Sequence, residues 1–358
     1  MRKLLALLFA LIALMLPVSA LDLPDGLDGL DGAVPGELLE SAEKGDDLMV
    51  RGAALLWETL RTALGETLAS SLRAAVALML LALLCGLADG TAEGAGETAV
   101  RFVPYAGVLG AAGLAAGDMH SLIGLGLETL DELAAMAKLL LPTMAAAMAG
   151  GGMVGTASVW QVGALMLSDL FLSLIRDLLV PVLCCVIAAA AAGALLPESG
   201  LTPLAEGAKK LLGWALGAVL TAFVAFLSLS GILAGSADRV AVRVGKTVVS
   251  GAVPVVGGIL SEATEAMLAA AGALRSTLGV LGVFAVLALC LAPLVQLGGQ
   301  YLLYRAAAFF CGVVGPKTLS DFLQQLSSAF SLMFAMTAGG AFLLLASLLV
   351  ALMMVVGV

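Results

Sequence analysis

Few side chains in this sequence could carry out catalysis. The chain has 358 residues and one histidine, His120. A serine nucleophile needs an adjacent base, and Ser158 with His120 is the pair that the sequence offers for this chemistry. The two residues lie on different segments, and no nucleophile-elbow pattern surrounds Ser158. The chain also lacks a phosphate-binding loop of the GxxxxGK[ST] type. We therefore predict that it is not an enzyme.

Neither a metal site nor a bound cofactor is expected. A metal ion needs three or four ligands, and no spacing of histidine and cysteine provides them. Residues 22–32 carry Asp22, Asp25, Asp28 and Asp31 at every third position. A calcium loop instead needs ligands at positions one, three and five with a later glutamate. We interpret this stretch as a flexible Gly/Asp linker and predict no catalytic, cofactor-binding or metal-binding residues.

Two arginines are candidates for charges inside a membrane. Arg176 lies in SDLFLSLIRDLLVP, and Arg305 lies in QYLLYRAAAFFCG. Ionisable groups within a membrane are costly and are functional candidates by default. The alternative is that each belongs to a loop or to the interface, where its charge reaches water by snorkelling. Asp169 and Arg176 are seven residues apart, so they would share one face of a helix.

Two apolar segments are interrupted by proline and glycine. Paired broken helices are the best sequence pointer to a substrate site in transporters. Tight helix packing through small residues is the alternative explanation. The candidate conduit residues in these two segments, 139–158 and 250–261, are Pro142, Gly150, Gly151, Gly152, Pro254, Gly257 and Gly258.

The composition indicates a membrane protein. Apolar residue types make up 61% of the chain and charged types 12%, whereas soluble domains carry about 25% charge. A soluble enzyme and a disordered chain are thereby excluded. The net charge of −9 without a basic cluster argues against nucleic-acid binding. All five cysteines lie in apolar runs, so we expect no disulfide framework.

We predict an all-α, polytopic membrane protein with about seven to eight transmembrane helices, some of them short or broken by Gly and Pro. Backbone polar groups in hydrocarbon must be satisfied within the segment, which requires helices. Lysines and arginines flank the spans equally on both sides and do not decide the orientation. The uncharged runs are 74–88, 102–117, 139–168, 178–197, 211–237, 247–261, 276–304 and 322–358, and run 247–261 is interpreted as re-entrant or broken.

Three domains are predicted, at residues 1–20, 21–72 and 73–358. Residues 1–20 have the basic, apolar and small-residue parts of a cleavable signal peptide; an uncleaved anchor helix is the alternative. Residues 21–72 carry eleven acidic and three basic residues and form an extracytoplasmic linker and amphipathic helix. The polytopic membrane domain follows. The candidate partner-binding residues on the amphipathic helix are Trp57, Leu60, Leu64 and Leu68, although packing on the membrane domain or in the interface is equally compatible.

Two segments resemble the stage III sporulation protein AE family. They are GGGMVGTASVWQVGALMLSDLFLSLIRDLLVPVL at 150–183 and KTVVSGAVPVVGGILSEATEAMLAAAGALRSTLGVLGV at 246–283, followed by Gly315-Pro316-Lys317. The resemblance extends over about residues 45–358. It implies a multi-pass protein of the mother-cell membrane that surrounds the forespore. There it would belong to a transenvelope channel with other proteins of the same operon, including ring-forming subunits and a partner ATPase, and would meet a forespore membrane protein indirectly.

Three functions remain open at this stage. The chain is the membrane-embedded component of the sporulation channel and is needed for late forespore development, or it is a structural platform that anchors the rings. The third alternative is an independent secondary transporter. All three involve the lipid bilayer and none involves nucleic acid.

Overall fold

The computed structural model describes residues 48–91, 97–150, 154–196, 200–252 and 257–356, and the elements in these ranges are helical. The predicted all-α class is confirmed. The predicted signal peptide and the acidic linker up to residue 47 lie outside the described residues. In chain order the elements are α3 (Leu48–Thr91), α4 (Glu97–Gly150), α5 (Val154–Leu174), the π-helical η2 (Ile175–Leu179), α6 (Val180–Leu195), α7 (Leu201–Ala252), α8 (Gly257–Val314) and α9 (Lys317–Val356).

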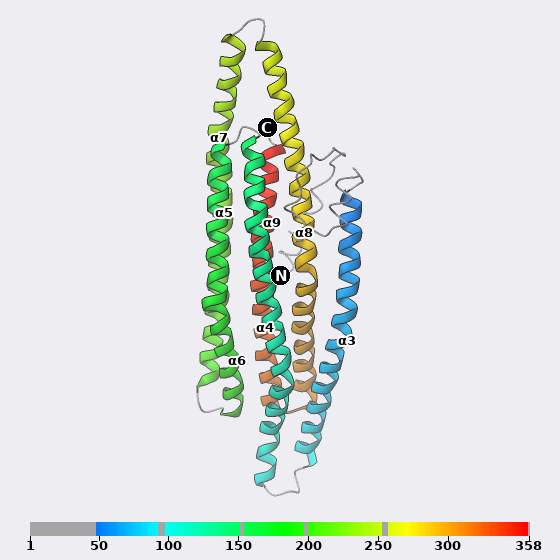
Figure 1. Ribbon diagram of the computed structural model, residues 1–358. Helices are drawn as coiled ribbons and strands as arrows, with labels where there is room; N and C mark the ends of the chain where they lie inside the picture. The colour runs from blue at the N-terminus through cyan, green and yellow to red at the C-terminus, as the bar shows by residue number, and fades with distance from the viewer. Residues whose placement is uncertain (1–47, 92–96, 151–153, 197–199, 253–256, 357–358) are drawn as a thin grey trace.

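The helices run side by side along one long axis, and successive rods alternate in direction (Figure 1). α5, η2 and α6 follow one another without a break and act as a single rod. α4 has 54 residues, which at a rise of 1.5 Å per residue makes it about 80 Å long. The hydrocarbon core of a bilayer is only about 30 Å thick. The longest helices must therefore continue well beyond the apolar layer.

Five helical stretches among the described residues are long and apolar enough to cross a membrane. This is fewer than the seven to eight predicted, because the sequence count ended each span at a charged residue. The helices instead continue through charges, as α4 does at Asp118 and the α5–α6 rod does at Arg176. The five stretches are Val103–Gly150, Val154–Leu195, Leu201–Leu229, Gly279–Val314 and Lys317–Leu352, and a shorter apolar helix covers Leu72–Ala88.

Pro142 does not break its helix, contrary to its interpretation as an interruption. It lies inside α4, which continues to Gly150. The hydroxyl of Thr143 donates hydrogen bonds to the carbonyl oxygens of Leu139 and Leu140, at 3.2 and 2.9 Å. Proline removes only the hydrogen bond to the carbonyl oxygen of Lys138, and membrane helices tolerate such a loss when neighbouring helices and side chains support them. α4 ends at Gly150 and α5 begins at Val154, so the predicted run 139–168 is divided between these two helices.

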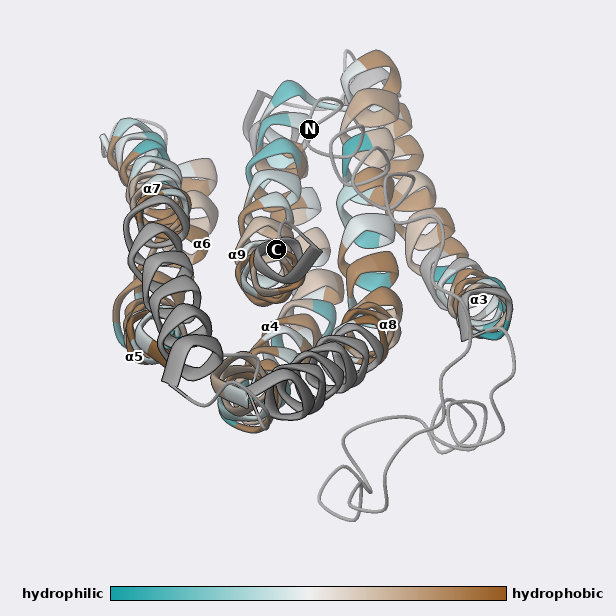
Figure 2. Ribbon diagram, turned by 90° about the horizontal axis from the view of Figure 1, so that it is seen from above, coloured by the Kyte–Doolittle hydropathy of each residue, from teal (hydrophilic) through white to brown (hydrophobic). Residues whose placement is uncertain are grey.

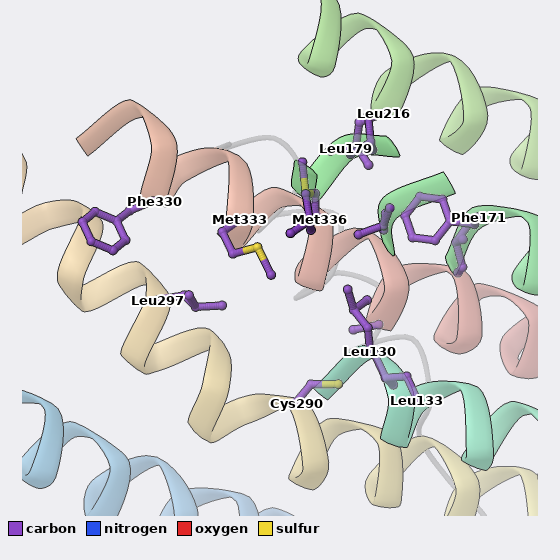
Figure 3. Packing of buried hydrophobic residues seen from close by; sticks show 14 of the residues in the cluster. Leu130, Leu133, Phe171, Leu179, Leu216, Cys290, Leu297, Phe330, Met333 and Met336 are labelled. Atoms are coloured by element: carbon purple, nitrogen blue, oxygen red, sulfur yellow. The ribbon is translucent and has the colours of Figure 1, made fainter. Parts of the chain in front are cut away.

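α9 is the central helix of the bundle. Viewed along the axis, it lies between α7 and α8, with α4 on a third side (Figure 2), and 72% of its most apolar stretch is buried. Met333 and Met336 lie at its centre and are almost fully buried. Figure 3 shows side chains of the other rods converging on them: Leu130, Leu133, Phe171, Leu179, Leu216, Cys290 and Leu297. The side chains around these methionines come from five of the six rods, and Leu78 and Ala82 of α3 join the sixth rod to the same hydrophobic core.

In its first part, residues 51–67, α3 buries small residues rather than leucines. Gly52, Ala63 and Thr67 are buried, and Gly52 and Thr67 face Phe284 and Gly299 of α8. Positions four residues apart rotate by about 40° per step around a helix of 3.6 residues per turn. The amphipathic helix was predicted from a stripe of leucines at every fourth position, Leu56, Leu60, Leu64, Leu68 and Leu72, and such a stripe therefore cannot face one neighbour along its whole length. α3 also continues without a break through residue 72, the predicted domain boundary.

Gly86 allows a backbone contact between α3 and the end of α8. A Cβ atom at this position would lie 2.1 Å from the carbonyl oxygen of Val314. Because the obstructing atom belongs to the backbone, it cannot move aside as the end of a side chain could. Small residues that let helices approach this closely are typical of membrane bundles. The contact holds α3 against the turn between α8 and α9.

We predict that Gly86→Ala lowers the stability of the protein by about 1–3 kcal/mol, the usual cost of overpacking. The measurement is thermal or denaturant unfolding of the purified chain in detergent micelles. Gly113→Ala is the matched control, because a Cβ atom there meets nothing within 4 Å and alanine favours the helix by up to about 1 kcal/mol. Equal effects of the two substitutions would refute the close contact at Gly86.

Candidate functional site

A polar cavity of about 750 Å³ lies between α7, α8 and α9. Its wall carries more basic than acidic side chains. The basic residues are Lys209, Lys210, Arg305 and Lys317, and the acidic residues are Glu206 and Asp321. Uncharged polar groups complete the wall: Thr202, Tyr301, Gln324, Gln325, Ser328 and Ser331. The cavity is therefore lined mainly by polar residues and has a positive formal charge, in contrast to the apolar core beside it, and its side chains Lys210, Arg305 and Lys317 are exposed.

Helical periodicity places these side chains on one face of each helix. Glu206 and Lys210 on α7 are four residues apart, as are Tyr301 and Arg305 on α8, so each pair lies on the same side. The polar stripe on α9 was missed in the sequence, because its first turns lie at the edge of the uncharged run 322–358. The repeat of Asp321, Gln324, Gln325 and Ser328 at intervals of three and four is the pattern that would have revealed it.

One of the four basic residues of the cavity has a hydrogen-bond partner, and the other three form no ion pair. The ammonium group of Lys209 donates a hydrogen bond to Oε1 of Gln325, which links α7 to α9. Lys210, Arg305 and Lys317 form no ion pair with any residue that the structure describes. Arg305, one of the two predicted intramembrane charges, thus lies where a polar ligand could reach it.

A partly buried hydrogen bond links α8 to α4 close to the cavity. The hydroxyl of Tyr304 donates to Oδ2 of Asp118 at 2.9 Å, and the ring packs on Phe330 of α9 with 4.8 Å between the ring centroids. Tyr304 is fully buried, so its hydroxyl needs such a partner. In the sequence Asp118 is only the end of an apolar run, whereas in the structure its carboxylate joins α4 to α8.

Arg176, the second predicted intramembrane charge, is paired away from the cavity. It lies in the π-helical η2 and forms an ion pair with Asp131 of α4. Its predicted neighbour on the same face, Asp169, is not the partner, because helix packing brings α4 alongside. The two paired side chains remain 55% and 58% exposed. Charges within membrane segments are usually paired in this way.

Those candidate conduit residues that the structure describes do not line the cavity. Gly150 is the last residue of α4, Gly257 and Gly258 are the first two residues of α8, and Pro142 lies within α4. Gly151, Gly152 and Pro254 lie outside the described residues. The structure therefore places the described members of the set at helix ends or inside a continuous helix.

The predicted partner face on α3 is divided by its packing. Trp57 is 69% exposed, Leu64 is also exposed, and Leu60 is half-buried. Leu68 lies on the same helix. Trp57 and Leu64 are seven residues apart, so they occupy one outward face of α3.

Ser158 and His120 are not brought together. α4 and the α5–α6 rod run in opposite directions, and their register is set by the Asp131–Arg176 pair. The two residues lie on opposite sides of this pair, about 40 Å apart along the axis at 1.5 Å per residue. The hydroxyl of Ser158 donates instead to the carbonyl of Gly155. Among the described residues, no three His, Cys, Asp or Glu side chains are grouped as metal ligands.

Comparison with known proteins gives a consistent assignment. A family model described as Stage III sporulation protein AE matches residues 36–357. The curated protein "Stage III sporulation protein AE" of Bacillus subtilis (strain 168) is 23% identical over 225 residues, which is 63% of this chain and 56% of the length of that relative. No solved structure matches.

We predict that Tyr304→Phe destabilises the protein by about 0.6–1.7 kcal/mol, the range for hydrogen bonds between membrane helices. Unfolding in mixed micelles would measure the change. Tyr301→Phe is the control, because Tyr301 lies one turn away on α8 and has no hydrogen bond to a described residue. If both variants lose the same stability, the bond to Asp118 is not the cause.

If the Arg176–Asp131 ion pair holds the two rods together, folding should depend on opposite charges at these two positions and not on which of the two carries the arginine. Arg176→Asp places two carboxylates side by side and should lower the yield of folded protein in membranes. The exchange Arg176→Asp with Asp131→Arg restores opposite charges and should recover most of that yield. Size-exclusion profiles of the purified variants provide the readout, and failure of the exchange to recover folding would contradict the pairing.

Proposed function

The chain belongs to the stage III sporulation protein AE family, and we propose that it is the membrane-embedded component of a channel between mother cell and forespore. Family membership gives it a role in sporulation. Its apolar helices are those of a multi-pass membrane protein. On this proposal it resides in the mother-cell membrane around the forespore and is needed for late forespore development.

The observation that supports a conduit is the polar cavity between α7, α8 and α9. Its wall offers lysine, arginine, serine and glutamine side chains in an open cavity between three apolar helices, and Lys210, Arg305 and Lys317 are exposed there. Polar side chains within membrane bundles are costly and usually line a pathway for ions or solutes. A purely mechanical anchor gains nothing from unpaired Arg305 and Lys317 at this position.

The proposal requires partners. We propose that other proteins of the same operon assemble with this chain, including ring-forming subunits and an ATPase, and that a forespore membrane protein meets the assembly indirectly. The sequence contains no nucleotide-binding loop of the GxxxxGK[ST] type, so an energy source would come from the ATPase. The outward face of α3 with Trp57 and Leu64 is suited to a protein contact. We assign no catalytic role to the chain.

A structural platform is the second candidate function. It is favoured by the position of α9, which fills the centre of the bundle where a central pore would have to run. Under this alternative the chain anchors the rings, and the polar cavity has no part in transport. An independent secondary transporter would instead move a solute in liposomes without any partner.

Complementation of a gene deletion distinguishes these functions. We predict that deletion in the bacterium that encodes the chain blocks forespore development after engulfment. The combined variant Arg305→Gln, Lys317→Gln should fail to restore heat-resistant spores while it still co-purifies with its partners. Lys138→Gln is the matched control, because this exposed lysine of α4 lies away from the cavity, and it should restore sporulation.

Assembly and development are scored separately. Loss of development with assembly retained supports the conduit. If every defective variant also loses its partners, the platform is preferred. Normal sporulation of the deletion strain would refute both, and solute uptake by liposomes that contain this chain alone would support the transporter.

A further inference from the structure

The polar cavity has the charge of an anion-binding site. Four basic and two acidic side chains line it, which gives the wall a formal charge of +2. Lys209 is engaged by Gln325, whereas Lys210, Arg305 and Lys317 have no ion-pair partner among the described residues. Three helices each contribute one of these three cations. Bringing like charges together costs free energy, which an anion between them would offset.

The uncharged groups in the wall suit a ligand with several oxygen atoms. Thr202, Gln324, Ser328 and Ser331 add hydroxyl and amide donors to the three cations. Phosphate groups are bound in this manner, by several charge-assisted hydrogen bonds from arginine and lysine together with neutral donors. A single carboxylate would leave many of these donors without a partner. The volume of about 750 Å³ lies within the usual range for small-molecule sites.

Exposed apolar side chains accompany the cations on the same helices. Trp214 lies four residues after Lys210 on α7 and is 71% exposed, and Phe309 lies four residues after Arg305 on α8 and is 78% exposed. Residues four apart share a helix face. Each of these two cations therefore has a large apolar group one turn away, a combination that suits a phosphate with acyl chains attached. Basic pockets between transmembrane helices are known to hold anionic lipid headgroups.

We propose that the cavity between α7, α8 and α9 binds a phosphate group, held by Lys210, Arg305 and Lys317. The headgroup of an anionic phospholipid is the source that the neighbouring Trp214 and Phe309 favour, and free phosphate is the other source with the same chemistry. Glu206 and Asp321 face the same space and weaken the attraction without cancelling it. The site does not depend on the channel proposal, because a platform or a transporter could bind the same group.

The test is binding by the full chain purified in a neutral detergent. Native mass spectrometry compares added phosphatidylglycerol, which is anionic, with phosphatidylcholine, whose phosphate is neutralised by choline. A parallel arm measures the thermal shift caused by inorganic phosphate against chloride at equal ionic strength. Selective retention of phosphatidylglycerol assigns the site to a lipid headgroup. A thermal shift by phosphate without lipid selectivity assigns it to a soluble phosphate.

Charge variants connect the binding to the cavity. Lys210→Gln, Arg305→Gln and Lys317→Gln should each weaken binding about fivefold, the effect expected for one basic residue near an anionic lipid. Asp321→Asn removes an opposing charge and should strengthen binding. Lys138→Gln, outside the cavity, should leave binding unchanged. The opposite directions of the two kinds of variant exclude a general loss of folding as the cause.

Two results would overturn the proposal. One is that neither phosphatidylglycerol nor inorganic phosphate is preferred over its control. The other is that binding is equally strong in the cavity variants and in Lys138→Gln. Because the assay is made on the isolated protein, its failure leaves the sporulation phenotype, and hence the channel proposal, to be judged separately.

Discussion

Packing around α9 is the interaction on which the rest of this bundle depends. Lipid tails are as apolar as leucine, so helices in a membrane gain little from hydrophobic burial against one another and associate through close contact. α9 makes this close contact through Met333 and Met336. Side chains of α4, α5, η2, α7 and α8 lie around these two methionines. Gly340 of α9 lies against Leu130 of α4, and Gly126 of α4 lies against Met333. A glycine on each of these two helices thus packs against a large side chain of the other helix.

The polar groups of the bundle fall into two kinds. The Tyr304–Asp118 hydrogen bond and the Arg176–Asp131 ion pair each join two helices and satisfy both partners. In the cavity, by contrast, three cations face an open space and form no ion pair with a described residue, although Glu206 and Asp321 line the same wall. Paired groups set the register of helices against one another, whereas unpaired groups remain available to a ligand. This difference in pairing, more than the presence of charge, separates a structural contact from a candidate site.

Individual residues show which features of the site and the packing could be predicted from the sequence. Arg305 was identified as a functional charge from its apolar surroundings, and it lies in the cavity. Arg176 was identified by the same reasoning, but its partner Asp131 lies 45 positions earlier on another helix, and no local pattern relates the two. Pro142 suggested a break because proline lacks an amide hydrogen, yet α4 continues past it. The stripe of leucines on α3 suggested one packing face, whereas the helix instead buries Gly52, Ala63 and Thr67 against its neighbour.

Composition and local order by themselves determined the class of this protein. A chain with 12% charged residues must place its backbone in membrane helices, because hydrocarbon offers no other partner for amide and carbonyl groups. The order of its motifs was also sufficient to place it in its family. The tertiary structure alone decided which helices pass through charges, which charges are paired and which three helices enclose a polar space. These outcomes depend on contacts between residues far apart in the chain, and helical periodicity sets only the face on which each residue lies.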